Sequence, residues 1–287
     1  MEIDAKTVAE LRRRTGLPMM KCKQALVESK GDLEGAEDHL RKLGMKTVDK
    51  VKDRTLKEGL VFTSGDAGGK AAVAVRCETD FVARSADFVA FGKALAAGLL
   101  AKAPKDAGVG ADLAEFPLAG GGKVGDTLRG LIAKLGENLA VGAFARFRSG
   151  EGLVASYVHH NEKVATLVDL AGKGIAGREE VKTLGTELCM HLAFHSDALA
   201  LRREDLDAAW VAKEREIFVA QAQEMPENKR AAIAEGKLSK RLKEVVFLEQ
   251  PFIKDEKRSV KEQVDAVGKQ IGAPLEIRRF ARISAGA

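Results

Sequence analysis

The stretch EGLVFTSGDAGGKAAVAV, residues 58–75, has a counterpart in EGLVASYVHHNEKVATLV, residues 151–168, so the letters EGLV return after 93 residues. Four further pairs keep this spacing: Val75 and Val168, Gly92 and Gly185, Leu95 and Leu188, Leu99 and Leu192. Apolar runs on both sides of a glycine-rich turn predict an antiparallel hairpin, and the leucine spacing predicts a helix after it. A unit of hairpin plus helix has therefore been duplicated.

A second echo extends the duplication toward the end of the chain. Gly136, Leu139 and Phe144-Ala145-Arg146 recur as Gly272, Leu275 and Phe280-Ala281-Arg282, now 136 residues later. The second copy therefore contains an insertion of 43 residues, which falls in the charged, helical stretch from Asp205 to Glu249. We expect a protruding helical arm with its own turn at Met225-Pro226-Glu227.

These patterns predict an α+β fold, with two similar small antiparallel sheets and helices on one side of each. The strand Ala140–Arg148 returns to the first sheet, and the glycine-rich stretch Ala103–Val124 is expected to form a long surface loop. The expected divisions are an N-terminal helical module at 1–44, a linker at 45–57, a first core subdomain at 58–148, a second at 149–204 and 250–287, and the inserted arm at 205–249.

The N-terminal module is predicted to contain three short helices. The first follows Thr7 and ends at Thr15-Gly16, with Val8 and Leu11 facing inward. Pro18 suits the first turn of the second helix, in which Met19, Cys22 and Leu26 share a buried stripe while Met20 faces solvent. The third runs from Leu33 to Gly44, and the charged residues after it form a linker or a polar linker helix.

Composition limits the functional class. No apolar run is long enough for a membrane span or a secretory signal, so we expect a cytoplasmic protein without membrane contact. Cys22, Cys77 and Cys189 lie far apart and predict neither disulfides nor a zinc site. The formal charge of +5 comes from interspersed charges and aromatics are 5%, which argues against direct nucleic-acid binding. The pI near 9 keeps an RNA-binding component of the translation apparatus as the alternative.

Motifs that are typical of enzymes lack the surrounding structure that their chemistry requires. Gly172-x-Gly174-x-x-Gly177 matches a dinucleotide fingerprint, but the helix after it leads into the arm instead of a parallel strand. His191 and His195 have metal-ligand spacing without a third ligand, which favours helix packing. No Walker sequence or nucleophile elbow is found, so we expect no catalytic residue, cofactor or metal. His159, near a hairpin tip beside Tyr157, is equally compatible with a plain turn residue and a partner contact.

The segment Arg76–Arg84, RCETDFVAR, is the least ordinary part of the chain, because a buried strand runs directly into a polar turn that carries an aromatic residue. Phe81 lies seven residues before Phe88, so one continuous helix would place both rings in the core. Ser85 can instead cap a helix that begins after it, which leaves Thr79–Arg84 as an exposed corner. From the residues alone, both arrangements stay open.

Two stretches resemble signatures of the elongation factor Ts family: LRRRTGLPMMKCKQAL, Leu11–Leu26, and CETDFVAR, Cys77–Arg84. Further similar stretches are GENLAVGAFARF from Gly136, YVH from Tyr157, MHLAF from Met190, LEQPFIKDEKRSV from Leu248 and RRFAR from Arg278. The resemblance is collinear over nearly the whole chain. It implies a UBA-like N-terminal module, a two-subdomain core and a coiled-coil arm. The chain ends at Ala287, soon after RRFARIS, whereas some members continue into another helical module.

The resemblance also implies a function: exchange of guanine nucleotide on the translational GTPase elongation factor Tu, by direct binding and without covalent chemistry. In the family, the positions of Met19 and Met20 touch the nucleotide domain of the GTPase. Those of Thr79, Asp80, Phe81 and Val82 enter beside its bound Mg²⁺ and dislodge the ion, and the His159 region reaches another domain. A homodimer or a 2:2 complex stays open.

Overall fold

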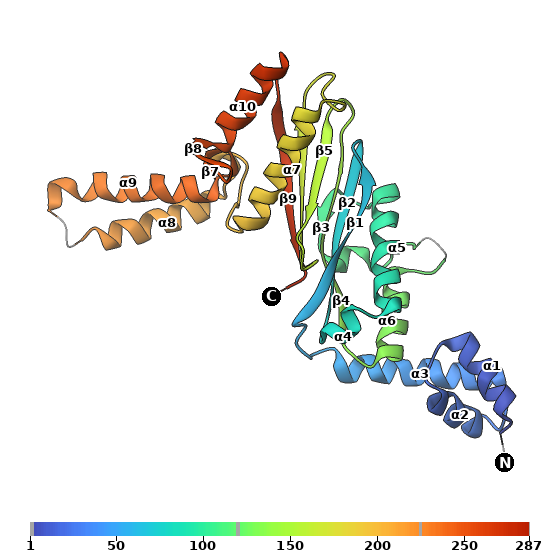
Figure 1. Ribbon diagram of the computed structural model, residues 1–287. Helices are drawn as coiled ribbons and strands as arrows, with labels where there is room; N and C mark the ends of the chain where they lie inside the picture. Colours follow the sequence, from blue (N-terminus) through green and yellow to red (C-terminus); the bar gives the residue numbers. More distant parts are fainter. Residues whose placement is uncertain (1–2, 119–120, 224–225, 287) are drawn as a thin grey trace.

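The computed structural model describes residues 3–118, 121–223 and 226–286, and it shows a helical N-terminal module, a layered centre and a projecting arm (Figure 1). The N-terminal helices are α1 (Ala5–Thr15), α2 (Met19–Glu28) and α3 (Leu33–Val51). Their small core contains Val8, Leu11, Cys22, Ala25, Leu26, Ala36 and Leu40. The stripe expected on the first two helices is confirmed for Val8, Leu11, Cys22 and Leu26.

Two helix boundaries differ from the sequence predictions. Helix α1 begins at Ala5, because Asp4 caps it by accepting a hydrogen bond from the Lys6 amide. Helix α3 does not stop at Gly44 but continues to Val51. A Cβ at Gly44 would lie 3.0 Å from the Cβ of Ala133, so this glycine permits close packing on a core helix instead of ending its own. Val51 then enters the first core, which fixes the helix to the centre of the molecule.

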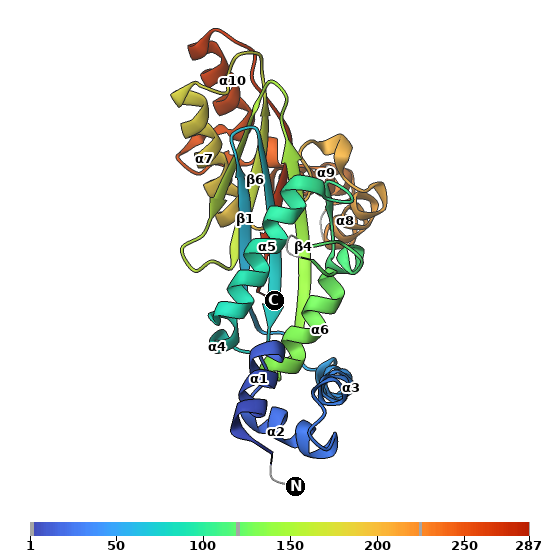
Figure 2. The same ribbon diagram turned by 90° about the vertical axis from the view of Figure 1, so that its right-hand side faces the viewer.

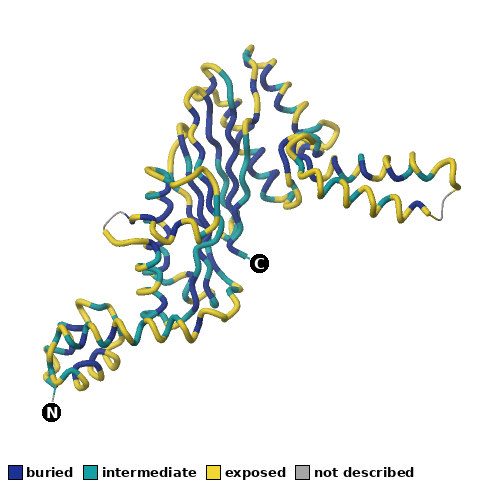
Figure 3. The backbone as a smooth tube through the Cα atoms, turned by 180° about the vertical axis from the view of Figure 1, so that it is seen from behind, coloured by how far each residue is buried: buried dark blue, intermediate teal, exposed yellow. Residues whose placement is uncertain are grey.

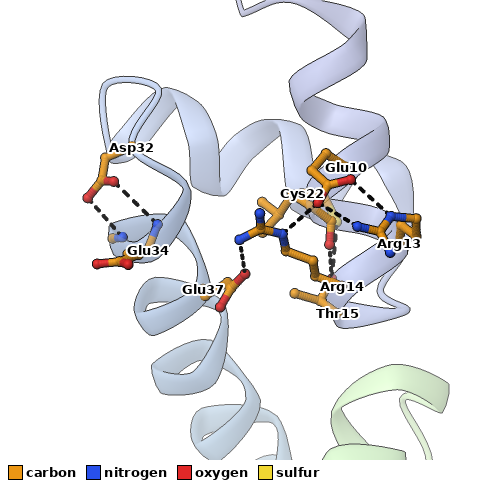
Figure 4. Close-up of polar contacts among 10 residues, drawn as sticks. Glu10, Arg13, Arg14, Thr15, Cys22, Asp32, Glu34 and Glu37 are labelled. Atoms are coloured by element: carbon orange, nitrogen blue, oxygen red, sulfur yellow. Dashed lines mark hydrogen bonds and ion pairs between the residues drawn. The ribbon is translucent and has the colours of Figure 1, made fainter.

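Polar contacts tie α1 to α3 (Figure 4). The Arg14 guanidinium donates to Glu10 at 2.7 Å within α1 and to Glu37 on α3 at 3.4 Å. Hydrogen bonds from Arg13 and Arg14 lower the pKa of Glu10 to about 2. Thr15 closes the far end of α1, where its hydroxyl donates to the Leu11 carbonyl. The Arg14–Glu37 contact links α1 to α3, whereas the other bonds lie within α1.

The first core subdomain is a four-stranded antiparallel sheet in the order β1-β2-β4-β3, covered on its outer face by α5 and α6 (Figure 2). Its elements are β1 (Glu58–Asp66), β2 (Gly69–Cys77), α4 (Asp80–Ala83), α5 (Ala86–Lys102), β3 (Ala107–Gly108), the 3₁₀ helix η1 (Gly110–Leu113), α6 (Val124–Leu135) and β4 (Leu139–Arg148). The predicted hairpin, helix and returning strand are all present.

The described residues of the stretch 103–124, which are 103–118 and 121–124, form more regular structure than the expected surface loop. They include β3, which pairs with β4, and η1. Leu113, Phe116 and Leu118 are buried and join the core beneath α5. These three side chains follow neither helical nor strand periodicity and lie among many glycines, so the sequence did not indicate that they belong to the core.

The second core subdomain is a three-stranded antiparallel sheet in the order β5-β6-β9, with α7 and α10 against it. Its elements are β5 (Leu153–Val158), β6 (Val164–Ala171), α7 (Glu179–Phe194), η2 (Arg203–Asp205), η3 (Phe247–Glu249), β7 (Pro251–Phe252), β8 (Asp255–Ser259), α10 (Val260–Ile271) and β9 (Glu276–Ser284). Because β6 lies antiparallel to both of its neighbours, Gly172, Gly174 and Gly177 do not belong to a parallel dinucleotide-binding unit.

The two sheets pack face to face, so the centre has four layers: helices, sheet, sheet, helices (Figure 1). A third core between the sheets contains Val61, Ala72, Ala74, Ala145, Phe147, Val154, Ala165, Leu167, Ile283 and Ala285. The two hairpins run in opposite directions, since the Val154 amide donates to Ala67 O at one end and the Val61 amide donates to Glu162 O at the other. Each hairpin tip therefore lies beside the base of the other hairpin.

The duplication is not copied in every detail. Leu60 pairs with Val75 in the first hairpin, but its counterpart Leu153 pairs with Leu170 instead of Val168. The second hairpin is thus offset by two residues, which leaves every side chain on the same face. Its turn is wider as a result, and this wider turn carries His159.

The insertion forms the expected arm, a pair of helices that projects from the centre (Figures 1 and 3). Helix α8 (Ala208–Gln221) packs along α9 (Glu227–Val245) through a narrow seam that includes Ala234, Leu238 and Leu242. Arg215 on α8 pairs with Glu235 on α9 at 2.8 Å. Met225 of the expected turn lies outside the described residues. Across residues 3–118, 121–223 and 226–286, no helix combines the length and apolarity that a membrane crossing requires.

Candidate functional site

The exposed corner after β2 is built by two successive helix caps. The Thr79 hydroxyl accepts from the Val82 amide at 3.4 Å and caps the four-residue α4. The Ser85 hydroxyl accepts from the Phe88 amide at 3.4 Å and caps α5. The chain therefore makes two helices here instead of the single one that would have buried both aromatic rings. Of the two arrangements left open by the sequence, the exposed corner is the one observed.

The corner turns one side to the core and one to solvent. Ala83 is buried and Val82 packs against the first core, whereas Asp80 is exposed and Phe81 is 83% exposed. A phenyl ring held in water by a capped helix loses the free energy that burial would supply, about 2 kcal/mol. Nothing in the described part of the chain covers this ring, so it is available to another molecule.

The His159 turn lies at the same end of the sandwich as α4. Its Glu162 carbonyl accepts from the Val61 amide at 2.8 Å, and Lys163 Nζ pairs with Glu58 at 2.6 Å. Glu58 in turn pairs across the sheet with Cys77, two residues before Thr79. The half-buried His159 ring lies 3.3 Å from the Tyr157 hydroxyl through Nδ1. Two segments that are about 80 residues apart in sequence are thus placed on one end of the fold.

Met19 and Met20 begin α2 in the N-terminal module, which projects beyond this same end of the sandwich (Figures 1 and 2). Met20 is 74% exposed, as expected, but Met19 is 50% exposed and does not join the buried stripe. Met19 is the first residue of α2, so no earlier helical turn shields its side chain from solvent. The buried residues of this helix are Cys22, Ala25 and Leu26. Both thioethers are free to contact a partner.

The other candidate groups have structural roles. His191 is buried, with Nε2 2.8 Å from Gln250 Oε1 and Nδ1 accepting from the Ile253 amide at 3.2 Å. Burial lowers the pKa of His191 to about 4. The helix-packing interpretation of His191 is therefore confirmed. Among the residues that the structure describes, no group of three or more His, Cys, Asp and Glu side chains is placed to hold a metal ion.

The sequence model of the family described as "Elongation factor TS" matches residues 78–287. The chain belongs to the elongation factor Ts family. It is 38% identical to elongation factor Ts of Clostridium botulinum over 99% of this chain and 93% of that protein. It is 33% identical to that of Treponema denticola over 100% and 99%, and 42% identical to that of Aromatoleum aromaticum over 90% and 84%. The resemblance and the α+β fold are confirmed, and the family places the chain in translation elongation.

Two residues that sequence reasoning did not single out contact the corner. Glu137 accepts from the hydroxyl and the amide of Thr79, at 2.6 and 3.0 Å. The Asn138 amide donates to Glu78 at 2.6 Å. Both residues belong to the GENLAVGAFARF stretch that resembles the elongation factor Ts family. Beside that resemblance, the sequence signal was two polar residues in the turn between a helix and a mostly apolar strand.

Proposed function

We propose that the chain is a guanine-nucleotide exchange factor for elongation factor Tu and acts by binding, without covalent chemistry of its own. The observation that carries the proposal is the 83% exposed ring of Phe81, held on a doubly capped corner within a segment that resembles a family signature. The activity needs no catalytic residue, because the barrier that it lowers is the release of a bound ligand.

In the proposed mechanism, Phe81 is a wedge. GDP in a GTPase is held by backbone amides, a lysine and a Mg²⁺ ion that bridges its phosphates. A ring that displaces this shell lengthens several charge-assisted contacts at once, and Asp80 beside it competes with the polar ligands around the ion. Loss of the ion leaves the phosphate charges poorly compensated. By linkage, a factor that weakens GDP binding is itself expelled when nucleotide rebinds.

The other exposed segments are proposed as additional contacts on the same GTPase. Met19 and Met20 offer flexible thioethers, which suit an apolar surface that changes shape with the bound nucleotide. His159, on the wide turn beside the corner, contacts a second region of the partner. Three contacts spread over one elongated molecule orient the wedge as well as anchor it.

The test is stopped-flow release of a fluorescent GDP analogue from elongation factor Tu, with and without the chain. We expect acceleration by the wild type. A phenylalanine side chain buries roughly 150–200 Å² when a partner covers it, and Phe81→Ala removes most of that side chain. If about half of the area is lost, the binding free energy falls by ~2 kcal/mol at about 25 cal/mol per Å². This loss should slow GDP release roughly 30-fold relative to the wild type. The melting temperature of Phe81→Ala should stay within about 2 °C of the wild type, because the ring is exposed.

Val109→Ala is the matched control, because Val109 is 58% exposed and belongs to another surface segment. This variant should release GDP at the wild-type rate. Equal rates for Phe81→Ala and the wild type would refute the wedge. No acceleration by the wild type would refute the exchange function itself.

A further inference from the structure

The turn between α6 and β4, residues 136–138, lies between two of the segments assigned above to partner binding. We propose that Glu137 is a positioning residue for the Phe81 corner and that Asn138 is a positioning residue for the N-terminal module. Two adjacent side chains then set the geometry of both contacts. This inference rests on the proposed exchange function and names the residues that prepare it.

Glu137 holds the corner through Thr79. Its two carboxylate oxygens accept from the hydroxyl and the amide of Thr79, at 2.6 and 3.0 Å. The same hydroxyl accepts from the Val82 amide and so caps α4. Because the Thr79 hydroxyl donates its proton to Glu137, its oxygen is left to accept from the Val82 amide of α4. A charged acceptor makes these bonds stronger than neutral ones.

Helix α4 depends on this arrangement more than a longer helix would. It has four residues, and one turn of helix has no stability of its own in water. Without Glu137 the Thr79 hydroxyl is free to rotate, and α4 loses its principal cap. Phe81 would then be carried on a disordered loop and would pay the cost of ordering when it meets the partner.

Asn138 holds the exit of α3. Its side-chain amide donates to the carbonyls of Lys52 and Arg54, at 3.0 and 2.9 Å, and its backbone amide donates to Glu78 at 2.6 Å. Asn138 is 8% exposed, so these bonds are shielded from competing water. Helix ends leave carbonyls without partners, and here one buried side chain satisfies two of the carbonyls just after α3.

The direction of α3 matters because this helix joins the first core to the module in which α2 carries the two methionines. It has 19 residues and a length of about 28 Å, so a tilt of ~10° at its exit would move the far end by about 5 Å. Contacts with α6 limit the tilt, since Gly44 packs on Ala133 and Lys21 Nζ on α2 donates to the Ala133 carbonyl at 3.2 Å. Glu78 accepts from Asn138 and lies 3.5 Å from Arg54, which joins the exit of α3 to the base of the corner.

The variant Glu137→Ala tests the first half of the proposal. At saturating concentration it should release GDP roughly tenfold more slowly than the wild type, while the half-saturating concentration changes less than about twofold, because the wedge is loosened and the other contacts remain. Glu137→Gln keeps one acceptor and a matching shape and should recover most of the rate. Glu115→Ala, at an exposed glutamate on another loop, is the control and should be silent.

A double-mutant cycle separates positioning from a general structural role. If Glu137 acts through Phe81, the variant Phe81→Ala/Glu137→Ala should be no slower than Phe81→Ala alone. Additive losses would overturn the proposal. Hydrogen exchange supplies a readout without the partner: the amides of Val82 and Ala83 should exchange faster in Glu137→Ala, while those in the middle of α5 stay unchanged.

Asn138→Ala tests the second half and should give the opposite kinetic pattern. The half-saturating concentration should rise about threefold or more with the saturating rate unchanged, because the methionines are misplaced while the wedge is intact. Asn138→Asp, which keeps the shape and loses both N–H donors, should raise it at least as much. Asn228→Ala on the arm, an exposed asparagine, is the matched control. A lower saturating rate with unchanged half-saturation would overturn this assignment.

The two proposals fail separately. If the wild type does not accelerate GDP release, or Phe81→Ala has no effect, the exchange mechanism fails, and hydrogen exchange still decides whether Glu137 orders α4. If Phe81→Ala slows release and Glu137→Ala does not, the wedge stands and its positioning by Glu137 is overturned.

Discussion

Gly92 lets α5 pack closely on the first sheet, and a methyl group there should destabilise the fold. A Cβ at this position would lie 2.2 Å from two atoms of the Phe62 ring. That ring is itself held against Phe88, with centroids 6.1 Å apart, and is nearly buried. Neither the ring nor the helix can move by more than an ångström without disturbing the core.

The expected cost follows from two opposing terms. Overpacking of a tight core costs about 1–3 kcal/mol, at the upper end for so short a contact, and replacing a helical glycine by alanine returns up to ~1 kcal/mol. We expect a net loss of about 2 kcal/mol and a melting temperature about 4–8 °C lower. Gly130→Ala, on α6 with nothing within 4 Å of the added Cβ, is the control and should be neutral or stabilising.

The duplication supplies a rescue experiment. Phe62 and Gly92 correspond to Ala155 and Gly185 at the spacing of 93 residues, and a Cβ at Gly185 would meet a methyl group at 2.7 Å instead of a ring. In Phe62→Ala/Gly92→Ala the new methyl enters the space that the ring leaves, so the double variant should lose less stability than the two single losses added together. Chemical denaturation monitored by circular dichroism measures all four proteins. An unchanged Gly92→Ala midpoint, or strictly additive losses, would refute the packing argument.

Two predictions concern buried titratable groups. The pKa of His191 falls from 6.5 to about 4 in the folded state. Between these two pH values, the unfolded chain takes up a proton on His191 and the folded chain does not. The free energy of unfolding should therefore fall by about 3 kcal/mol because of this residue as the pH drops from 6.5 to 4. Denaturation curves of His191→Gln should lack that part of the slope; equal slopes would contradict it. Burial raises the pKa of Cys77 and of Cys189 to about 12, so neither thiol should react with iodoacetamide at pH 8 unless the protein is unfolded, as mass spectrometry would show.

Local sequence offered two arrangements of the segment that carries Phe81 and left the choice between them to tertiary structure. Ser85 was recognisable as a cap, which made an exposed corner conceivable, but a continuous helix through Phe81 fitted the apolar spacing equally well. The observed corner also uses Glu137, 58 residues away, to hold Thr79. Hydrogen bonds between distant segments leave no periodic pattern in the sequence, so the sequence could not use them to decide between a buried and an exposed Phe81.

For Met19 the sequence made a definite prediction that was wrong. Helical periodicity placed it on the stripe of Cys22 and Leu26, yet it lies half in solvent because it is the first residue of its helix. Gly44 was read as the end of a helix, although its role is to let α3 touch α6. The exposure of Met19 depends on its position in its own helix, whereas the role of Gly44 depends on a neighbour in another element, α6.

By itself, the sequence determined the duplication, the insertion that makes the arm and the faces of most helices and strands, because these depend on spacing along the chain. Only the tertiary structure decided that the two sheets pack with their hairpins reversed, which places the His159 turn at the same end as the Phe81 corner. It also decided the two-residue offset between the hairpins. A shift by two keeps each side chain on its face, so the alternation of apolar residues is the same in either register and cannot distinguish them.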